Sequence, residues 1–385
     1  MEQEPVTQVV RLTPEGRGAV AVLLAVGPHG AEQVERYFFG HANAPLSSRP
    51  LNRVYHGHWG GPEGEDVVVC RRSDSEVEIH CHGGSAAAER IIADLAAAGC
   101  QSLAWRDWLG RQESDGIRAE AARLLADART ERTAAILLDQ YHGALETVLA
   151  DIERDLDAGD REAAAIGLEA LLARSRVGLH LVEPWRVVLA GPPNVGKSSL
   201  VNALVGYRRS IVFDEPGTTR DVVTVATAID GWPIELSDTA GMRASDDPLE
   251  QAGVELARRR LAAADCVVLV FDATERAADR REAVIHDYPE AIVACSKVDL
   301  LPPSEAAGIE AADIDRPICL TSAVTGLGIG ELAAAIVRRL IGVEPRPGDA
   351  VPFTASQVQQ LFLARDAVGR GELATAGEHI HELRL

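Results

Sequence analysis

The most constraining feature of this chain is the stretch GPPNVGKSS at residues 191–199, which fits the phosphate-binding pattern G-x-x-x-x-G-K-[ST]. The apolar stretch RVVLA precedes it and SLVNALVG follows it, so the motif has the strand–loop–helix setting that it needs. In that setting, backbone N–H groups of the loop and of the helix N-terminus point at phosphate groups. The stretch predicts an α/β domain that binds a nucleoside triphosphate.

Individual positions of this loop have distinct expected roles. Gly191 and Gly196 permit the tight turn and the close approach of the backbone to phosphate. Lys197 is expected to reach the β- and γ-phosphates, and the hydroxyl of Ser198 to bind magnesium. The other loop residues expected to contact the nucleotide are Asn194, Val195 and Ser199.

Later stretches indicate which nucleotide is bound. LSDTAG at 236–241 ends an apolar stretch with Asp238, which can hold magnesium through water, and places Gly241 where its N–H can meet the γ-phosphate. In CSKVD, the carboxylate of Asp299 can accept the N1 and N2 protons of guanine, a pair that adenine lacks, and Lys297 can lie along the base plane. Each motif is weak alone, but their order after successive expected strands predicts guanine specificity.

A third polar segment, TSA, follows the last expected strand. Ser322 and Ala323 can support the guanine O6 through their backbone N–H groups.

Apolar stretches and turn residues predict the organisation of the chain. Short apolar strands alternate with helices in the βαβ rhythm of a mostly parallel sheet; they are expected at 186–190, 233–237, 265–271, 291–296 and 317–321. A helical run is expected at 117–156, with a break at Gly159 and Asp160 and a further helix from 161. Before that run, strands and helices alternate in a small α+β unit.

We therefore expect a multidomain α/β protein with four segments. An N-terminal α+β domain covers 1–110, and a first helical part covers 111–182. The P-loop domain covers 183–342, and a second helical part at 343–385 is expected to pack on the first, with Val358, Leu361, Phe362 and Val368 facing the core. The P-loop domain is then an insertion in an all-α domain.

GTTRD at 217–221, DTAG at 238–241, SKVD at 296–299 and SA at 322–323 resemble the TrmE–Era–EngA group of GTPases. The resemblance implies that Thr219, beside Thr218, binds magnesium when GTP is bound. The group usually has asparagine where this chain has Ser296. We expect the shorter side chain to lose an amide contact to the base and to the loop, which weakens guanine affinity without abolishing it.

Asn194 stands three residues before the loop lysine. In potassium-dependent GTPases an asparagine there supplies a ligand to a monovalent cation, which takes the place of an arginine finger. FDEPGTT at 213–219 is long enough to form the accompanying potassium loop. The alternative is that Asn194 only tightens the turn.

The resemblance extends to the MnmE (TrmE) family over most of the chain. TPEGRGAVAVL at 13–23, EVEIHCHGG at 76–84 and IRAEAARLLADARTERTAAI at 117–136 are similar to family motifs. The family layout implies a folate-binding-type N-terminal domain and a helical domain that holds the inserted GTPase. It also implies that Glu250, twelve residues after Asp238, orients the attacking water. The alternative is that Glu250 only interacts favourably with the dipole at the start of a helix.

Two departures from the family fall outside the GTPase motifs. LAWRDWLGRQESDG at 103–116 stands where the family has a G-E-F-T segment, and the sequence ends HELRL where the family has C-x-G-K. The family role implies a homodimer through the N-terminal domain, tRNA as substrate, a folate derivative and a flavin-carrying partner. Two alternatives stay open: a regulatory or ribosome-assembly GTPase without the modification chemistry, and a nucleotide-binding scaffold with little hydrolysis.

Net charge, cysteine spacing and the N-terminal residues bear on RNA contact, on the redox state of the cysteines and on the cellular location. The net charge of -20 excludes a broad basic surface, so RNA contact requires a local patch or a partner. The six cysteines form no C-x-x-C pair and are expected to be reduced thiols. MEQEPVTQVV does not resemble a signal peptide, and no apolar run is long enough for a membrane span, so a cytoplasmic protein is expected.

Overall fold

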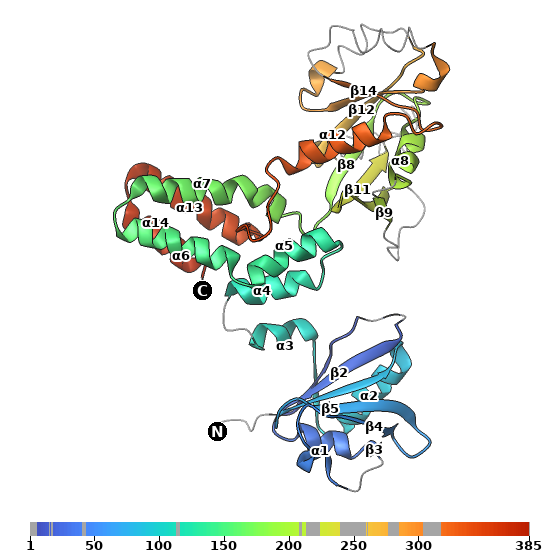
Figure 1. Ribbon diagram of the computed structural model, residues 1–385, viewed down its shortest axis with the longest axis vertical. Coiled ribbons are helices and arrows are strands. Elements are labelled where there is room, and N and C mark those ends of the chain that lie inside the picture. Colours follow the sequence, from blue (N-terminus) through green and yellow to red (C-terminus); the bar gives the residue numbers. More distant parts are fainter. Residues whose placement is uncertain are drawn as a thin grey trace. The chain divides into compact units, whose positions relative to one another are not determined.

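The computed structural model describes residues 6–14, 16, 18–40, 44–112, 116–207, 210–212, 224–238, 259, 261–275, 285–302 and 317–384. The chain divides into two compact units, Met1–Ser114 and Asp115–Leu385 (Figure 1). The first unit is built on one β-sheet. The second combines a group of helices with a second sheet, so the chain is multidomain, as the sequence predicts.

Within the described residues, unit 1 forms a seven-stranded sheet in the order β3-β4-β5-β6-β2-β1-β7. Its strands are β1 (Gln8–Arg11), β2 (Val20–Val26), β3 (Phe38–Gly40), β4 (Val54–Trp59), β5 (Glu65–Arg71), β6 (Glu76–His82) and β7 (Gln101–Leu103). Neighbouring strands are antiparallel except for the parallel pair β1–β7. The helices are α1 (Gly30–Glu35), α2 (Ser85–Ala97) and α3 (Trp105–Gln112).

Alternation of apolar and polar residues sets the two faces of this sheet. In β6, Val77 and Ile79 are fully buried, whereas Glu78 and His80 lie on the opposite, partly exposed face. This period-two alternation is typical of a strand with one buried face. The strands β1, β3, β4 and β7 were not predicted from the sequence. Three of them, β1, β3 and β7, have only three or four residues, which is too short for a visible alternation.

The helical part of unit 2 contains four helices before the second sheet and two after it, among the residues described. They are α4 (Gly116–Leu125), α5 (Glu131–Tyr141), α6 (Ala144–Asp157), α7 (Arg161–Gly178), α13 (Ala355–Arg370) and α14 (Leu373–Glu382). The expected run at 117–156 is therefore three helices. Thr130, whose hydroxyl accepts a hydrogen bond from the Thr133 N–H, begins α5, and Gly143, at φ 97°, separates α5 from α6.

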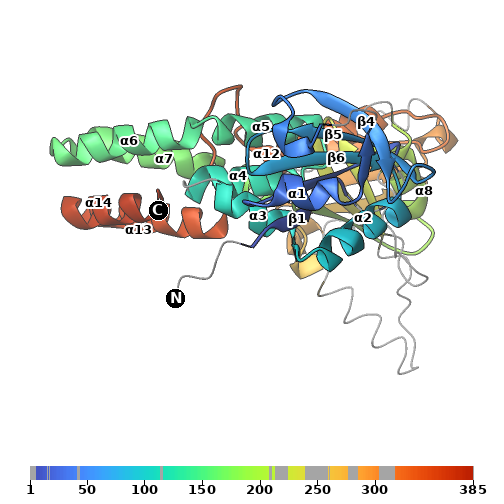
Figure 2. The ribbon, with the colours of Figure 1, turned by 90° about the horizontal axis from the view of Figure 1, so that it is seen from below.

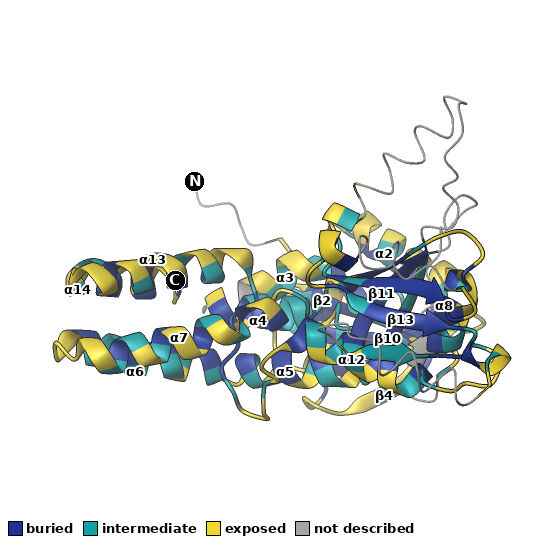
Figure 3. Ribbon diagram, turned by 90° about the horizontal axis from the view of Figure 1, so that it is seen from above, coloured by how far each residue is buried: buried dark blue, intermediate teal, exposed yellow. Residues whose placement is uncertain are grey.

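The C-terminal helices pack on the earlier ones, as expected from the sequence: α13 lies against α7 and α14 against α6, and Figures 1 and 2 show these helices side by side. Each helix also keeps an exposed stripe, drawn yellow in Figure 3. Leu361 and Val368 of α13 are buried, as predicted. Phe362 is 42% exposed, so its expected place in the core is wrong; it is one position away from the buried stripe.

The second sheet has the order β14-β13-β12-β8-β11-β10-β9 within the described residues. Its strands are β8 (Trp185–Ala190), β9 (Ser210–Val212), β10 (Thr224–Ile229), β11 (Trp232–Asp238), β12 (Cys266–Asp272), β13 (Ile292–Ser296) and β14 (Ile318–Leu320). The five strands from β14 to β11 are parallel, whereas β10 and β9 add antiparallel pairs at one edge. The mostly parallel sheet is as predicted; the edge pair was not foreseen.

Apolar residues cover both faces of this sheet. On one face, residues of β8 and β12 join α8 (Lys197–Val205) and α12 (Ile329–Ile341) in a continuous core. On the other face, Leu269 and Phe271 pack with Val293 and Cys295. Successive residues of one strand thus serve opposite cores, which explains why these strands read as unbroken apolar runs and why β11 and β13 are buried in Figure 3.

Two further findings concern cysteines and membranes. All six cysteines are free thiols. Burial raises the pKa of the Cys266 thiol to about 12, so this group stays protonated. Across the described ranges, no helix combines the length and apolar character that a membrane crossing requires.

Candidate nucleotide-binding site

The loop between β8 and α8 has the backbone geometry that a phosphate cradle needs. Asn194 and Gly196 both adopt left-handed conformations, with φ of 64° and 95°, which turn the chain sharply before α8. A Cβ atom on Gly191 would lie 2.2 Å from the carbonyl oxygen of Val270, so only glycine fits there. The loop therefore runs close over the backbone of β12.

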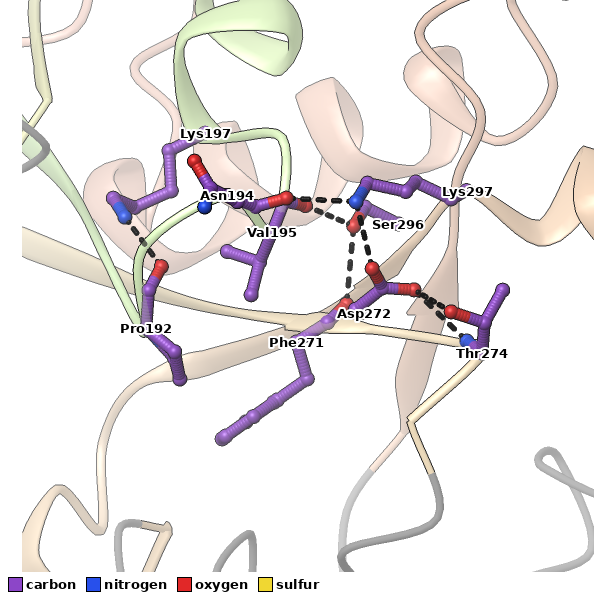
Figure 4. A network of polar contacts seen from close by, with 9 residues as sticks. All are labelled: Pro192, Asn194, Val195, Lys197, Phe271, Asp272, Thr274, Ser296 and Lys297. Carbon is purple, nitrogen blue, oxygen red and sulfur yellow. Dashed lines mark hydrogen bonds and ion pairs between the residues drawn. The ribbon is translucent and has the colours of Figure 1, made fainter.

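Lys197 is the first residue of α8 and is 3% exposed. Its Nζ donates a hydrogen bond to the carbonyl oxygen of Gly191 at 3.0 Å. A second bond goes to the carbonyl oxygen of Pro192 at 2.7 Å (Figure 4). Burial lowers the pKa of Lys197, and the nearby Asp238 carboxylate opposes that shift. Two neutral carbonyl groups solvate this ammonium without neutralising it, so the loop is a site for an anionic group such as phosphate.

Ser198 and Asp238 meet on the same side of the loop. The Ser198 hydroxyl donates a hydrogen bond to Oδ2 of Asp238, which is 6% exposed at the end of β11. The parallel pairing of β11 with β8, in which Asp238 lies beside Leu189, brings this carboxylate to the loop. Hydroxyl and carboxylate oxygens are the hard donors that magnesium uses together with phosphate oxygens, so the pair fits the ion.

The base-recognition motif lies at the end of β13, where Ser296 is 2% exposed. Its hydroxyl oxygen is within hydrogen-bond distance of the carbonyl oxygens of Val195 and, at 3.1 Å, Phe271 (Figure 4). The hydroxyl has one proton and donates it to one of these acceptors at a time. The buried hydroxyl thus supplies a contact to the loop at Val195 in place of the amide contact that serine loses.

The next residue, Lys297, also contacts the loop. Its backbone is left-handed, at φ 60°, and its Nζ lies 2.7 Å from the carbonyl oxygen of Asn194 and 2.7 Å from Oδ2 of Asp272 (Figure 4). Sequence reasoning missed Asp272. Its signal was a carboxylate at the carboxyl end of β12, because polar residues at that edge of a parallel sheet reach the ligand.

The remaining base-side residues lie on neighbouring turns. Asp299 is exposed in the short 3-10 turn Val298–Leu300, and Ser322 is buried after β14. The N–H of Ser322 donates to the carbonyl oxygen of Leu327 at 2.9 Å, which leaves Ala323 as the better candidate for a contact with the guanine O6. Hydrogen bonds from Thr321 to the Cys295 carbonyl hold the two strand ends together.

Comparisons with known proteins agree with this geometry. A family model described as 50S ribosome-binding GTPase matches residues 186–297. The chain is 32% identical over 368 residues to the tRNA modification GTPase MnmE of Symbiobacterium thermophilum, covering 85% of this chain and 80% of that protein. The MnmE of Geobacillus thermodenitrificans is also 32% identical, over 381 residues, covering 88% of this chain and 82% of the relative.

This chain belongs to the MnmE family. It is a P-loop GTPase, with GTP, GDP and magnesium as ligands of the loop. Among solved structures, Aquifex aeolicus Era bound to GDP and AlF4− matches 47% of this chain and 66% of the Era chain, at 29% identity and a TM-score of 0.34.

Several predicted site residues of this MnmE-family chain lie outside the described residues. They are Thr218, Thr219, Gly241 and Glu250. The structure does bring together the loop residues 191–199, Asp238, Ser296 and Lys297, although they come from different strands. Asn194 and Ser199 are exposed on this loop, and Val195 is buried beneath it.

The MnmE-type motif EVEIHCHGG occupies β6 and the turn after it. Cys81 is buried, and burial raises the pKa of its thiol, whereas His82 lies on the opposite face with its Nδ1 2.5 Å from Oε1 of Glu65. Cys81 therefore faces away from His80 and His82, because successive residues of a strand point to opposite faces. A Cβ on Gly83 would lie 1.7 Å from the carbonyl oxygen of Gly18, which explains the glycine in the motif.

Proposed function

We propose that this chain is a potassium-stimulated GTPase that acts in modification of the wobble uridine of tRNA. The carrying observation is the 32% identity to a tRNA modification GTPase across 85% of the chain, a share too large to be confined to the P-loop domain. The loop geometry adds independent support, because its lysine, serine and base-motif contacts are those of a nucleotide-binding loop.

Hydrolysis in this proposal needs positive charge beside the phosphates and a correctly oriented water molecule. Lys197 supplies positive charge beside the β- and γ-phosphates, and Glu250 orients the attacking water. Bound magnesium offsets phosphate charge, and Ser198, Asp238 and Thr219 would hold it. Asp299 and Ala323 select guanine through its Watson–Crick edge and O6.

Asn194 is proposed as a side-chain ligand of potassium. The residue is exposed at the turn of the loop, and its backbone carbonyl is already held by Lys297. Its side-chain carboxamide can therefore bind a cation while its backbone carbonyl accepts the hydrogen bond from Lys297. A monovalent cation between the phosphates would take the place of an arginine finger.

Assembly and partners complete the proposal. The chain would form a homodimer through its N-terminal domain, and its GTPase domains would pair when GTP is bound. A folate derivative and a flavin-carrying partner would supply the modification chemistry, and tRNA would be the substrate.

Wobble-uridine analysis tests this role. A strain that lacks the gene is complemented with the wild-type chain or with Lys197→Met, and its tRNA is digested and analysed by mass spectrometry. We expect the modified nucleoside only with the wild type. An unmodified wobble uridine in the wild-type-complemented strain would refute the tRNA role and leave the GTPase assignment intact.

A second candidate is a regulatory or ribosome-assembly GTPase that lacks the modification chemistry. The segment WRDWLGRQ, which forms α3, favours it, because this helix stands where the family has its G-E-F-T segment. Folate retention separates the two functions. Purified protein that turns over GTP and retains no added 5-formyl-tetrahydrofolate supports the second candidate.

A further inference from the structure

Asp272 is the last residue of β12 and lies beside Ser296 in the parallel pair β12–β13. Its side chain is 9% exposed and is part of the contact network in Figure 4. Oδ2 accepts a hydrogen bond from Nζ of Lys297 at 2.7 Å. Oδ1 accepts bonds from the backbone N–H of Thr274, at 2.9 Å, and from its hydroxyl, at 2.7 Å. Thr274 therefore holds one oxygen of the carboxylate, and the other oxygen holds Lys297.

The ammonium group of Lys297 bridges two parts of the site. It contacts the Asp272 carboxylate and the Asn194 carbonyl at the same distance, 2.7 Å. The Lys297 side chain is 35% exposed although its ammonium group is anchored at both acceptors. Without the carboxylate, the ammonium would keep only the Asn194 carbonyl of these two partners, so more rotamers of Lys297 would be accessible.

We propose that Asp272 is the positioning residue of the guanine site: it holds Lys297 against the phosphate loop so that the lysine chain forms a ready platform for the face of the base. Asp272 acts through Lys297 and touches neither the base nor the reacting phosphates. Its contribution is to nucleotide affinity, because the ordering of Lys297 precedes binding.

The neighbouring serine explains why this chain depends on such a contact. The Ser296 hydroxyl supplies one proton to two acceptors, Val195 and Phe271, where an asparagine amide would supply two. Lys297 adds a second link from the base motif to the loop, at Asn194. Ser296 thus contacts the loop at Val195, and Lys297 contacts it at Asn194. Asp272 positions Lys297 for the second of these contacts.

The charge state of Asp272 suits this role across the physiological pH range. Burial alone would raise the pKa of its carboxyl, but hydrogen bonds from Lys297 and Thr274 outweigh burial, and the pKa lies below its ordinary value. The carboxylate is therefore charged at neutral pH, where its contact with Lys297 persists.

The test is a double-mutant cycle on the full chain with binding and turnover measured separately. We expect Asp272→Asn to raise the dissociation constants for GTP and GDP about tenfold, the loss typical of one charge-assisted hydrogen bond. The kcat at saturating GTP should change less than about twofold, because no contact to the reacting phosphates is lost. In a Lys297→Met background, Asp272→Asn should have no further effect on affinity.

Two matched measurements guard against a purely structural effect. Thr274→Val removes a hydroxyl donor to the same carboxylate but leaves Lys297 in contact, so its affinity should stay within about twofold of wild type. Inosine triphosphate presents the same ring face without the exocyclic amino group, so Asp272→Asn should weaken it by the same factor as GTP. Thermal unfolding without nucleotide verifies that each variant folds.

Three results would overturn the inference. They are wild-type affinity in Asp272→Asn, an equal loss of affinity on adding Asp272→Asn to Lys297→Met, and a fall in kcat with unchanged affinity. If Asp272→Asn does not fold, Asp272→Glu keeps the charge, moves the carboxylate, and must then show the same Lys297-dependent loss.

Discussion

The hydroxyl of Thr130 donates a 2.7 Å hydrogen bond to the carbonyl oxygen of Gly231, which follows it by 101 residues. Thr130 is also the residue that caps α5, and Gly231 belongs to the tight turn between β10 and β11. Arg132 packs beside this bond, with its guanidinium 5.3 Å from the ring centre of Trp232 and an ion pair to Glu344. The turn of the nucleotide-domain hairpin is therefore anchored on the helical part.

We predict that Thr130→Ala lowers the free energy of unfolding by about 2–3 kcal/mol, because it removes a helix cap and a partly buried hydrogen bond together. Asp160→Ala is the matched control, since Asp160 caps α7 on an exposed site with a 3.0 Å bond from the Ala163 N–H. Its cost should be about 1 kcal/mol. Urea unfolding of both variants decides the matter; equal costs would mean that the bond to Gly231 contributes nothing.

A second prediction concerns Ser296. Ser296→Ala removes the hydroxyl that reaches Val195 and Phe271, so we expect the dissociation constant for GDP to rise about tenfold. Ser296→Asn supplies an amide with two protons and should bind GDP at least as tightly as wild type. Fluorescence titration with a labelled GDP measures both variants. Unchanged affinity for GDP in Ser296→Ala would show that the contact between Ser296 and the loop contributes nothing to nucleotide binding.

The third prediction separates the side chain of Asn194 from its backbone. Turnover of the wild type should be at least about tenfold faster in potassium than in sodium, and Asn194→Ala should bring that ratio close to one. Affinity for GTP should persist in Asn194→Ala, because the carbonyl oxygen that Lys297 contacts belongs to the backbone. Equal wild-type turnover in the two salts would remove the cation from the mechanism.

The fourth prediction is a pH dependence of stability at His180, which stacks on Trp185 with ring centres 3.7 Å apart. Burial lowers the pKa of His180, although Asp265 and the Glu183 carbonyl oppose the shift. The unfolded state then binds the proton first, so stability is complete above the unfolded pKa of about 6.5 and is lost as pH falls toward the lower folded pKa.

His180→Phe keeps an aromatic ring for the stack and removes the titration. We expect the wild type to lose on the order of 1 kcal/mol more than His180→Phe between about pH 8 and about pH 5.5. Denaturant unfolding at several pH values measures the difference. Parallel pH curves for the two proteins would contradict the assigned pKa direction.

Much of the fold follows from local sequence. The loop 191–199 can be recognised from the sequence because its glycines, lysine and serine act through backbone conformation and immediate neighbours. The five parallel strands stand out because both of their faces are buried, which requires unbroken apolar runs. The division of 117–156 into three helices was missed because the stretch stays apolar at helical spacing across Thr130 and Gly143.

The contacts within the site depended on the tertiary structure. Asp272 and Lys297 are 25 residues apart, and Ser296 and Val195 are 101 residues apart. Motif order could predict that these segments share one site, since parallel strands end at one edge. Strand order alone places β12 between β8 and β13, and so decides that the carboxylate of Asp272 meets Lys297. Local propensity describes a residue and its neighbours along the chain; a hydrogen bond between strands needs their positions in space.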